Sequence, residues 1–201
     1  LQLVKDGKAD AFVTAGNTGA ALPNGLFILK RIRGVKRPAL TVLLPTRKGR
    51  TVLLDIGANA DCKAEYLLQF GIMGSVYAKK VLGIDNPRVA TLSNGEEEGK
   101  GNTLVKEAQM LLKKSKLNYI GNVESKEFYG GGADVVVTDG FTGNIFLKTS
   151  ESVAAFMSDM IRDNITKSPI TTLGGLLVRP AFSSIRKYMD PTEVGGAPLL
   201  G

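Results

Sequence analysis

Residues 133–144 read ADVVVTDGFTGN, and IFLKTSESVAAFMSDMIRDNI follows them over residues 145–165. The apolar run with its consecutive valines is typical of a strand that is buried on both faces. A short polar loop with two glycines then leads into the apolar spacing of a long helix. A buried strand that turns directly into a helix is half of a βα unit, so this stretch predicts a parallel sheet with helices on both sides.

The same rhythm recurs along most of the chain. The apolar runs predict further strands over residues 9–15, 39–46, 51–57, 88–94 and 118–123. Helices are predicted over residues 63–83 and 103–114, and another from about Leu22, because Pro23 suits a first helical turn. No linker or internal repeat divides the sequence, so we expect one α/β domain with a largely parallel sheet.

Composition excludes several kinds of catalysis. The 201 residues include no histidine and one cysteine, Cys62. A Ser-His-Asp triad and the usual zinc sites are therefore excluded, and Cys62 has neither a disulfide partner nor a histidine base. Any general acid or base must be Lys, Asp, Glu or Tyr, and we expect no metal and no cofactor. The first residues read as the end of a helix, so the chain resembles part of a longer protein.

Positive charge is concentrated in one segment. The net charge is +7, and residues 30–50 hold eight basic residues and no acidic one. We expect no nucleic-acid partner, because this segment lacks a recognition motif and interleaved aromatic residues. An acidic protein, phosphates, an anionic lipid surface or a merely solubilising face all remain open.

The pattern changes near the C-terminal end, where residues 162–190 are predicted to form a protruding helical hairpin. Its tip is apolar and is flanked by the basic residues Arg179, Arg186 and Lys187. The apolar residues of this tip are Leu173, Leu176, Leu177, Val178 and Phe182. Two interpretations stay open: a helix that packs on its neighbour or on a second subunit, and a tip that rests on an anionic membrane.

Four predicted strands end in small polar loops that enter helices. These loops cover residues 16–19, 57–61, 95–102 and 139–144. In an open parallel sheet the carboxyl ends of the strands share one edge, and helix N-termini there favour phosphate. Because neither a G-x-G-x-x-G motif nor a Walker A loop is present, nucleotide binding by those motifs is disfavoured.

Two side chains in these loops have alternative interpretations. Lys100, between Gly99 and Gly101, is either a solvated lysine beside three glutamates or a cation that holds phosphate or neutralises an oxyanion. Asn144 is either the cap of a helix that begins at Ile145 or a donor to the same oxygen. If Lys100 is functional, its removal should lower turnover severely and leave the fold intact. If it is a solvated turn residue, activity should stay nearly normal.

At this point several stretches together resemble the PlsX-type phosphate acyltransferases of bacterial phospholipid synthesis. These stretches are AGNTGA (15–20), LLDIGANADCKAEYLLQFGIMGSVYAKKVLGIDNPRV (53–89), GEEEGKGN (95–102), IGNVE (120–124), ADVVVTDGFTGNIFLKTSE (133–151) and GGAPLLG (195–201). The resemblance implies a three-layer α/β/α fold like that of phosphotransacetylases and of isocitrate and isopropylmalate dehydrogenases. Family members have further segments before and after this stretch, so the resemblance implies a single domain over residues 1–201 that is incomplete at both ends.

The resemblance also implies an activity and partners. Family members form acyl phosphate from acyl-[acyl carrier protein] and inorganic phosphate, and they are cytoplasmic, peripherally membrane-associated and usually homodimeric. Carried over to this sequence, Lys100 and Asn144 are the expected catalytic residues, with Glu98 and Asp139 as organisers of the lysine. The expected phosphate- and substrate-binding residues are Asn17, Thr18, Asn59, Gly99, Gly101, Asn102, Asp139, Thr142 and Gly143. Two alternatives remain: a phosphotransacetylase-like enzyme that uses acyl-CoA, and a non-catalytic scaffold that binds carrier protein or membrane.

Overall fold

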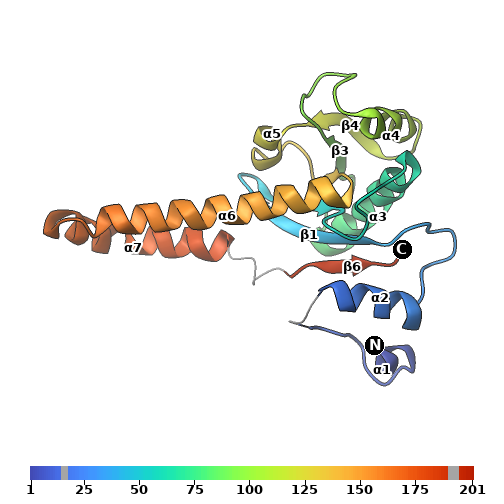
Figure 1. The fold of residues 1–201 in the computed structure, drawn as a ribbon, viewed down its shortest axis with the longest axis horizontal. Helices are drawn as coiled ribbons and strands as arrows, with labels where there is room; N and C mark the ends of the chain where they lie inside the picture. The colour runs from blue at the N-terminus through green and yellow to red at the C-terminus, as the bar shows by residue number, and fades with distance from the viewer. Residues whose placement is uncertain (15–17, 190–194) are drawn as a thin grey trace.

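In the computed structural model, which describes residues 1–14, 18–189 and 195–201, six strands form one sheet in the order β4-β3-β5-β2-β1-β6 (Figure 1). The strands are β1 (Ala39–Thr46), β2 (Gly49–Leu54), β3 (Arg88–Leu92), β4 (Asn118–Val123), β5 (Val135–Val137) and β6 (Ala197–Leu199). The helices are α1 (Gln2–Lys5), α2 (Thr18–Ile28), α3 (Ala64–Leu82), α4 (Thr103–Lys113), α5 (Ser125–Tyr129), α6 (Gly140–Ile165) and α7 (Pro169–Met189).

The sheet is mixed but mostly parallel. Strands β4, β3, β5 and β2 run parallel to one another, whereas β1 pairs antiparallel with both β2 and β6. A tight turn joins β1 to β2, and Gly49 supplies the positive φ of 121° that this reversal uses. The predicted α/β class with a largely parallel sheet is confirmed.

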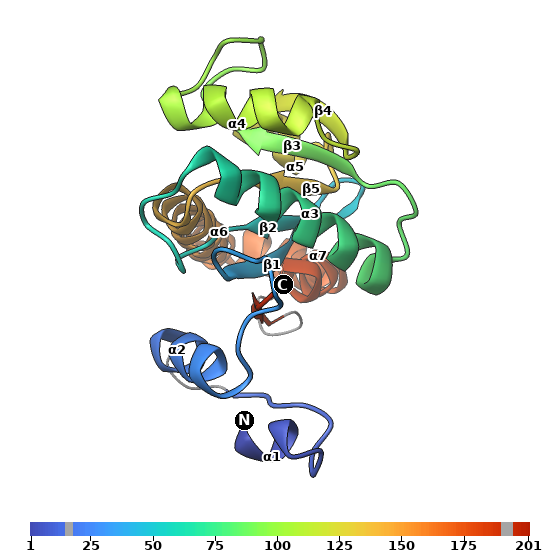
Figure 2. The ribbon, with the colours of Figure 1, turned by 90° about the vertical axis from the view of Figure 1, so that its right-hand side faces the viewer.

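Alternate residues of the central strands fill the two faces of the sheet. Val135 and Val137 belong to the cluster that packs under α3 and α4, whereas Val136 packs with Phe128 of α5 and Leu147 of α6. Helices α3 and α4 cover the face toward the viewer in Figure 2, and α6 lies behind it. The core therefore has helices on both sides, which the continuous apolar strands predicted.

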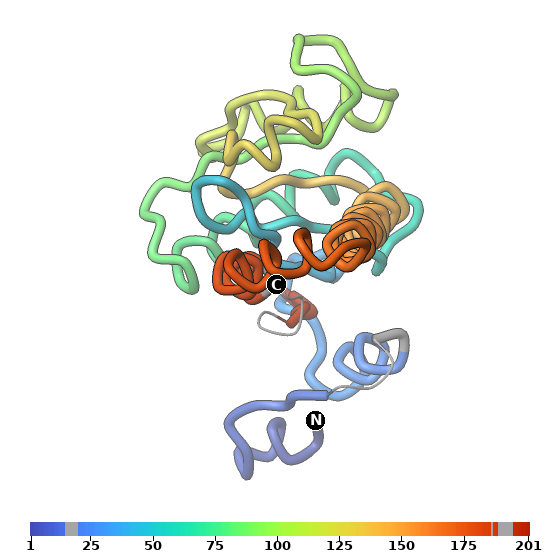
Figure 3. Tube along the Cα trace, turned by 90° about the vertical axis from the view of Figure 1, so that its left-hand side faces the viewer, coloured from blue at the N-terminus to red at the C-terminus, as the bar shows by residue number. Residues whose placement is uncertain are grey.

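Helices α6 and α7 form a hairpin that projects from the body of the molecule (Figures 1 and 3). Near the turn, Gly175 allows α7 to approach Ile165 of α6 so closely that a Cβ at residue 175 would collide with it. At the other end of α7, the Tyr188 hydroxyl donates to the carbonyl oxygen of Gly49 at 2.7 Å and of Thr46 at 2.9 Å. No helix in the described part of the chain is both long and apolar enough to cross a membrane.

The N-terminal prediction is wrong. Residues 9–14 form no strand, and Val13 is 92% exposed; residue 15 lies outside the described residues. Helix α2 begins at Thr18 rather than near Leu22, and it contains Pro23. Figures 2 and 3 show α1 and α2 beyond the β6 edge, away from the two covered faces. An apolar run forms a strand only where it pairs with a neighbouring strand, and residues 9–14 pair with no strand of the described sheet.

Candidate functional site

The carboxyl ends of β2, β5, β3 and β4 meet at one edge of the sheet, because these neighbouring strands are parallel. Three of the polar loops predicted from the sequence, those at 57–61, 139–144 and 95–102, leave this edge. In the structure the connecting loops cover residues 55–63 after β2, residues 138 and 139 after β5, and residues 93–102 after β3. In open parallel sheets this edge is the usual ligand-binding side. The candidate site is therefore built from these three loops.

The β2 loop is organised around a carboxylate that sequence reasoning missed. Asp55 is fully buried, and Oδ1 accepts hydrogen bonds from the N–H groups of Leu40 at 2.9 Å, Ala58 at 3.1 Å and Gly57 at 3.3 Å. Oδ2 accepts from the Asn59 N–H at 2.7 Å and from its side-chain amide at 2.9 Å. Five donors satisfy this charge, so Asp55 holds the loop in shape rather than facing a ligand.

Asn59 is part of the same scaffold. Its buried side-chain amide also donates to the Pro38 carbonyl at 2.7 Å, which ties the β2 loop to the start of β1. Its own carbonyl accepts from the Gly140 N–H at 2.7 Å, and this bond joins the β2 loop to the first turn of α6. Because the backbone N–H and the side-chain NH₂ group of Asn59 already have protein partners, no free donor supports its predicted role in phosphate and substrate binding.

Two predicted residues after β5 cap α6, which begins at Gly140 rather than at Ile145. Asp139 Oδ1 accepts from the Thr142 N–H at 2.8 Å, and the Thr142 hydroxyl donates to Oδ2 at 2.8 Å. A Cβ at Gly140 would lie 2.6 Å from the Asn59 carbonyl oxygen, and one at Gly143 would collide with the Asp55 carbonyl oxygen. The glycines therefore allow α6 to start against the β2 loop.

Asn144 does not cap a helix, which corrects the structural interpretation of this residue. It lies in the first turns of α6, it is exposed, and its side-chain carbons lie 4.0 Å from where a Cβ of Gly57 would be. Its amide has no hydrogen-bond partner in the part of the chain that the structure describes. Asn144 is thus available to a ligand at the junction of the β2 and β5 loops.

The β3 loop presents Lys100. Gly99 and Gly101 have φ angles of 93° and 98°, which glycine adopts readily, and a Cβ at Gly101 would lie 2.5 Å from Val105. The Lys100 side chain folds over buried Gly95, where an added Cβ would lie 2.6 Å from its Cγ. The Lys100 ammonium forms no ion pair or hydrogen bond with any described residue. Asn102 caps α4 by accepting from the Val105 N–H at 2.9 Å.

The glutamates of this loop do not pair with Lys100. Glu98 pairs with Lys113 of α4, and the hydrogen bond and charge of that lysine lower the pKa of Glu98. Glu96 hydrogen-bonds to Glu127 of α5, and this bond and the charge of Glu127 raise the pKa of Glu96. The predicted organisers of the lysine, Glu98 and Asp139, are therefore both engaged elsewhere.

Not all of the predicted loops meet. The β2 and β5 loops are hydrogen-bonded to each other, but no hydrogen bond in the described ranges joins them to the β3 loop, which is the uppermost part of the molecule in Figures 1 and 2. Asn17 lies outside the described residues. Thr18 begins α2, which lies beyond the edge strand β6, and its side chain is not described. The described residues include no cluster of three or more potential Cys, Asp or Glu metal ligands.

The basic segment 30–50 does not form one surface. Residues 30–37 lead to Pro38 beside the candidate site, where Lys36 pairs with Glu65 and the Arg37 guanidinium lies 5.9 Å from the Tyr66 ring centre. Residues 47–50 lie at the far end of the β1–β2 hairpin, where Arg47 and Lys48 form the turn and Arg50 is in β2. Sequence proximity could not reveal this separation, because an antiparallel hairpin places its turn at the opposite edge.

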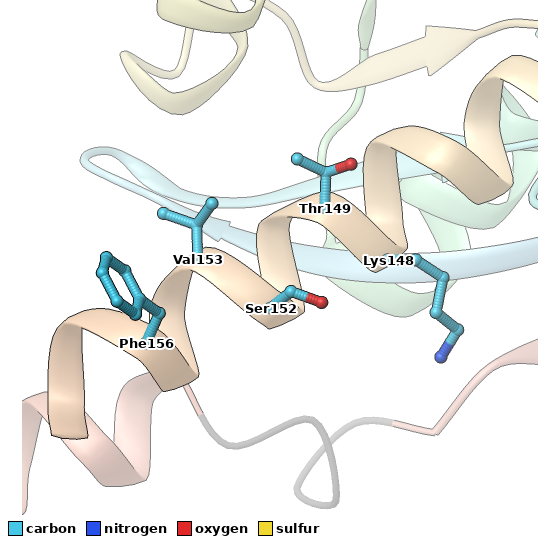
Figure 4. A pocket seen from close by; sticks show the side chains of 5 residues that line it. All are labelled: Lys148, Thr149, Ser152, Val153 and Phe156. Carbon is cyan, nitrogen blue, oxygen red and sulfur yellow. The ribbon is translucent and has the colours of Figure 1, made fainter.

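The helical hairpin exposes apolar side chains on both of its helices. All five residues of the predicted tip are exposed, with Leu177 the most exposed of them at 79%. On α6, a shallow surface hollow is lined by Lys148, Thr149, Ser152, Val153 and Phe156 (Figure 4). An apolar surface of this kind is typical of a face that contacts another molecule.

A sheet with helices on both faces, together with the strand-end loops, defines an α/β protein. Its candidate site lies at the carboxyl ends of the parallel strands. A phosphotransacetylase from Streptococcus pyogenes has a similar fold, with a TM-score of 0.59 at 22% identity, over 76% of this chain and 53% of that one. A branched-chain phosphotransacylase from Enterococcus faecalis V583 gives a TM-score of 0.57 at 18% identity, over 76% of this chain and 62% of that one.

The chain belongs to the fatty acid synthesis protein family, whose family model matches residues 1–201. A phosphate acyltransferase of Alkaliphilus oremlandii is 53% identical over all 201 residues, which cover 60% of that protein. Another, from Syntrophotalea carbinolica, is 54% identical over 201 residues and 58% of its length. The resemblance to phosphate acyltransferases is thus confirmed, and the chain spans about three fifths of the length of these relatives.

Proposed function

We propose that this chain carries the phosphate site of an acyltransferase that forms acyl phosphate from acyl-[acyl carrier protein] and inorganic phosphate. One observation supports the assignment of the site. Among the predicted polar side chains whose contacts the structure describes, Asn59, Asn102, Asp139 and Thr142 are engaged within the protein, whereas Lys100 and Asn144 have no partner. A cation and an amide donor are the groups that an anionic substrate needs.

The reaction requires no nucleophile from the protein. A phosphate oxygen attacks the thioester carbonyl carbon, a C–O bond forms, and the carbonyl electrons move to oxygen as a tetrahedral oxyanion. The oxyanion then collapses, the C–S bond breaks, and the thiolate leaves and takes up a proton as the free thiol of the carrier. Lys100 would neutralise phosphate or oxyanion charge, and Asn144 would donate a hydrogen bond to the same group. Cys62 takes no part, because burial raises the pKa of its thiol to about 12.

Charge and exposed apolar surface support the choice of partners. The basic residues 30–37 lie at the substrate edge, where they would steer an acidic carrier protein toward the site. The exposed tip of α7 carries Arg179 close to its leucines, a combination that suits an anionic membrane surface. The proposed enzyme is cytoplasmic, rests on the membrane through this tip, and forms a homodimer.

Comparison of two acyl donors with phosphate tests the substrate. Long-chain acyl-carrier protein and acetyl-CoA are each incubated with phosphate and the 201-residue chain, and also with a chimera in which this chain replaces the matching segment of the A. oremlandii relative. We expect phosphate-dependent thiol release from acyl-carrier protein. Faster release from acetyl-CoA would favour a phosphotransacetylase, and no release from either protein with either donor would favour a non-catalytic scaffold.

Vesicle flotation tests the membrane contact. Vesicles rich in phosphatidylglycerol should carry the wild-type chain upward, and a variant with Leu176→Asp and Leu177→Asp should remain at the bottom. Unchanged flotation of this variant would overturn the membrane contact. Sedimentation of the same two proteins without vesicles tests the dimer, because a tip that serves only the membrane leaves the dimer intact.

A further inference from the structure

We infer, on the basis of the proposed function, that Asn122 and Gln109 are positioning residues that hold Lys100 through its backbone. Neither residue lies in the predicted site loops. Asn122 is in β4 and Gln109 is in α4, and both are buried although both are polar. Buried amides that face a functional loop need partners, and these two find theirs in the backbone carbonyls of Glu97 and of Lys100 itself.

The contacts converge on one carbonyl. The Gln109 side-chain amide donates to the Lys100 carbonyl oxygen at 3.2 Å, and the Asn122 amide lies 3.5 Å from the same oxygen. The Asn122 amide also donates to the Glu97 carbonyl at 3.2 Å. Both ends of the Glu97–Lys100 turn are thus attached to a β-strand, and one end is also attached to a helix.

Hydrogen bonds to the Asn122 side-chain oxygen set the orientation of these amides. Asn122 Oδ1 accepts from the Thr91 hydroxyl at 2.7 Å and from Gln109 at 3.0 Å, so its NH₂ group must point to the loop. The Thr91 hydroxyl in turn lies 2.8 Å from the Tyr119 hydroxyl. A connected network of this kind is rigid, because rotation of the Asn122 amide or loss of the Thr91 hydroxyl leaves a buried donor or acceptor without its partner.

The loop needs such support because its glycines provide little of their own. Gly99 and Gly101 flank the lysine and restrict its backbone less than any other residue would. A catalytic cation must be held in place before the transition state forms, and a displacement of about 1 Å can cost roughly 100-fold in rate. Neutral amides suit this role, since a carboxylate at either position would compete with substrate for the ammonium group.

A double-mutant comparison in the chimera, or in the 201-residue chain if that is active, tests the inference. Asn122→Ala and Gln109→Met are each made in the wild-type and in the Lys100→Ala background. We expect each to lower kcat about 10- to 100-fold with little change in the KM for phosphate, but to cost less than about two-fold once Lys100 is absent. Equal losses in both backgrounds, or an unchanged kcat, would overturn the inference. Gln109→Met decides the outcome if Asn122→Ala does not fold.

Thr51→Val is the matched control, because it removes a buried hydrogen bond, 2.8 Å to the Ala133 carbonyl, that does not touch the loop. It should lower stability while leaving kcat within about two-fold. Amide hydrogen exchange over residues 95–101 gives a readout without activity. Exchange there should accelerate in Asn122→Ala but not in Thr51→Val, and unchanged exchange would overturn the inference. Absent thiol release with accelerated exchange would instead refute only the proposed function.

Discussion

The backbones of the loops after β2 and β3 are both held in position by buried polar side chains, but in opposite ways. After β2, a buried side-chain carboxylate, Asp55, gathers the backbone N–H groups of its own loop. After β3, side chains from outside the loop bind its backbone carbonyls, and the basic residue of the loop, Lys100, has no partner for its side chain among the described residues. The difference teaches that a charged residue at a strand end is available for chemistry only where other groups hold the backbone.

The largest effect is expected when the carboxylate of the β2 loop is removed. Asp55→Ala leaves five N–H donors without their acceptor, so the free energy of unfolding should fall by about 4 kcal/mol. Urea denaturation followed by circular dichroism measures this loss. A loss below about 1 kcal/mol would show that the β2 loop is not organised around Asp55.

The free lysine of the β3 loop should show the reverse pattern. Lys100→Ala should lower kcat roughly 100- to 1000-fold, or about 3 kcal/mol in the barrier, because one preorganised charge is lost. Its free energy of unfolding should change by less than about 0.5 kcal/mol, since the side chain is exposed and has no partner. Near-normal phosphate-dependent thiol release by the variant would return Lys100 to the role of a solvated turn residue. Lys106→Ala, an exposed lysine on α4, is the control.

A second carboxylate at the same edge separates capping from loop scaffolding. Asp139→Ala removes the cap of α6 but leaves the β2 loop intact, so stability should fall by about 1 kcal/mol. Asp139→Asn should recover most of this loss, because its side-chain oxygen still accepts from the Thr142 N–H. Thermal unfolding of the three proteins in parallel gives the comparison, and equal losses for the two variants would argue against a capping role.

The smallest effect is expected at Cys62, in the β2 loop. Burial raises the pKa of its thiol from 9.0 to about 12, so at pH 8 the thiolate is far scarcer than in the unfolded chain. Alkylation by iodoacetamide at pH 8 should be at least about 100-fold slower in the folded protein than in urea. Cys62→Ser should leave kcat within about two-fold.

The same shift predicts how stability depends on pH. Because the folded thiol keeps its proton above the pH at which the unfolded thiol ionises, ionisation favours the unfolded chain, and the Cys62 contribution to stability falls as pH rises from about 9 toward 12. Cys62→Ser should reduce this fall. Rapid alkylation of the folded protein at pH 8 would show that the β2 loop is open.

The sheet could be largely predicted from the sequence, because its strands carry continuous apolar runs between glycine-containing turns. Residues 39–46 and 118–123 form strands with the predicted bounds, and 135–137 lie within the predicted run. The strand predicted at residues 9–15 was wrong, since apolar character indicates that a segment is buried but does not identify the element that buries it. The antiparallel direction of β1 depends on the Arg47–Lys48 turn, which a pattern of apolar runs does not report.

The candidate site was less predictable than the fold. Sequence reasoning found Lys100 and Asn144, because a lysine between glycines and an asparagine after a strand are visible locally. It missed Asp55, Gln109 and Asn122, whose roles come from partners far from them in the sequence or hidden in the loop backbone. The one available signal was polar character within otherwise apolar segments, as in TVLLDIG and NYIGNV.

Helix α6 has a geometric consequence for the whole molecule. It starts with the turn that carries Asn144 and runs without interruption for 26 residues to the hairpin turn, a length of about 39 Å at 1.5 Å per residue. A continuous helix acts as a spacer of set length. Whatever surface binds the tip of α7 therefore also sets the distance between that surface and the strand-end edge. Under the proposed function, an acyl chain taken from that surface must cross this distance or arrive on a carrier.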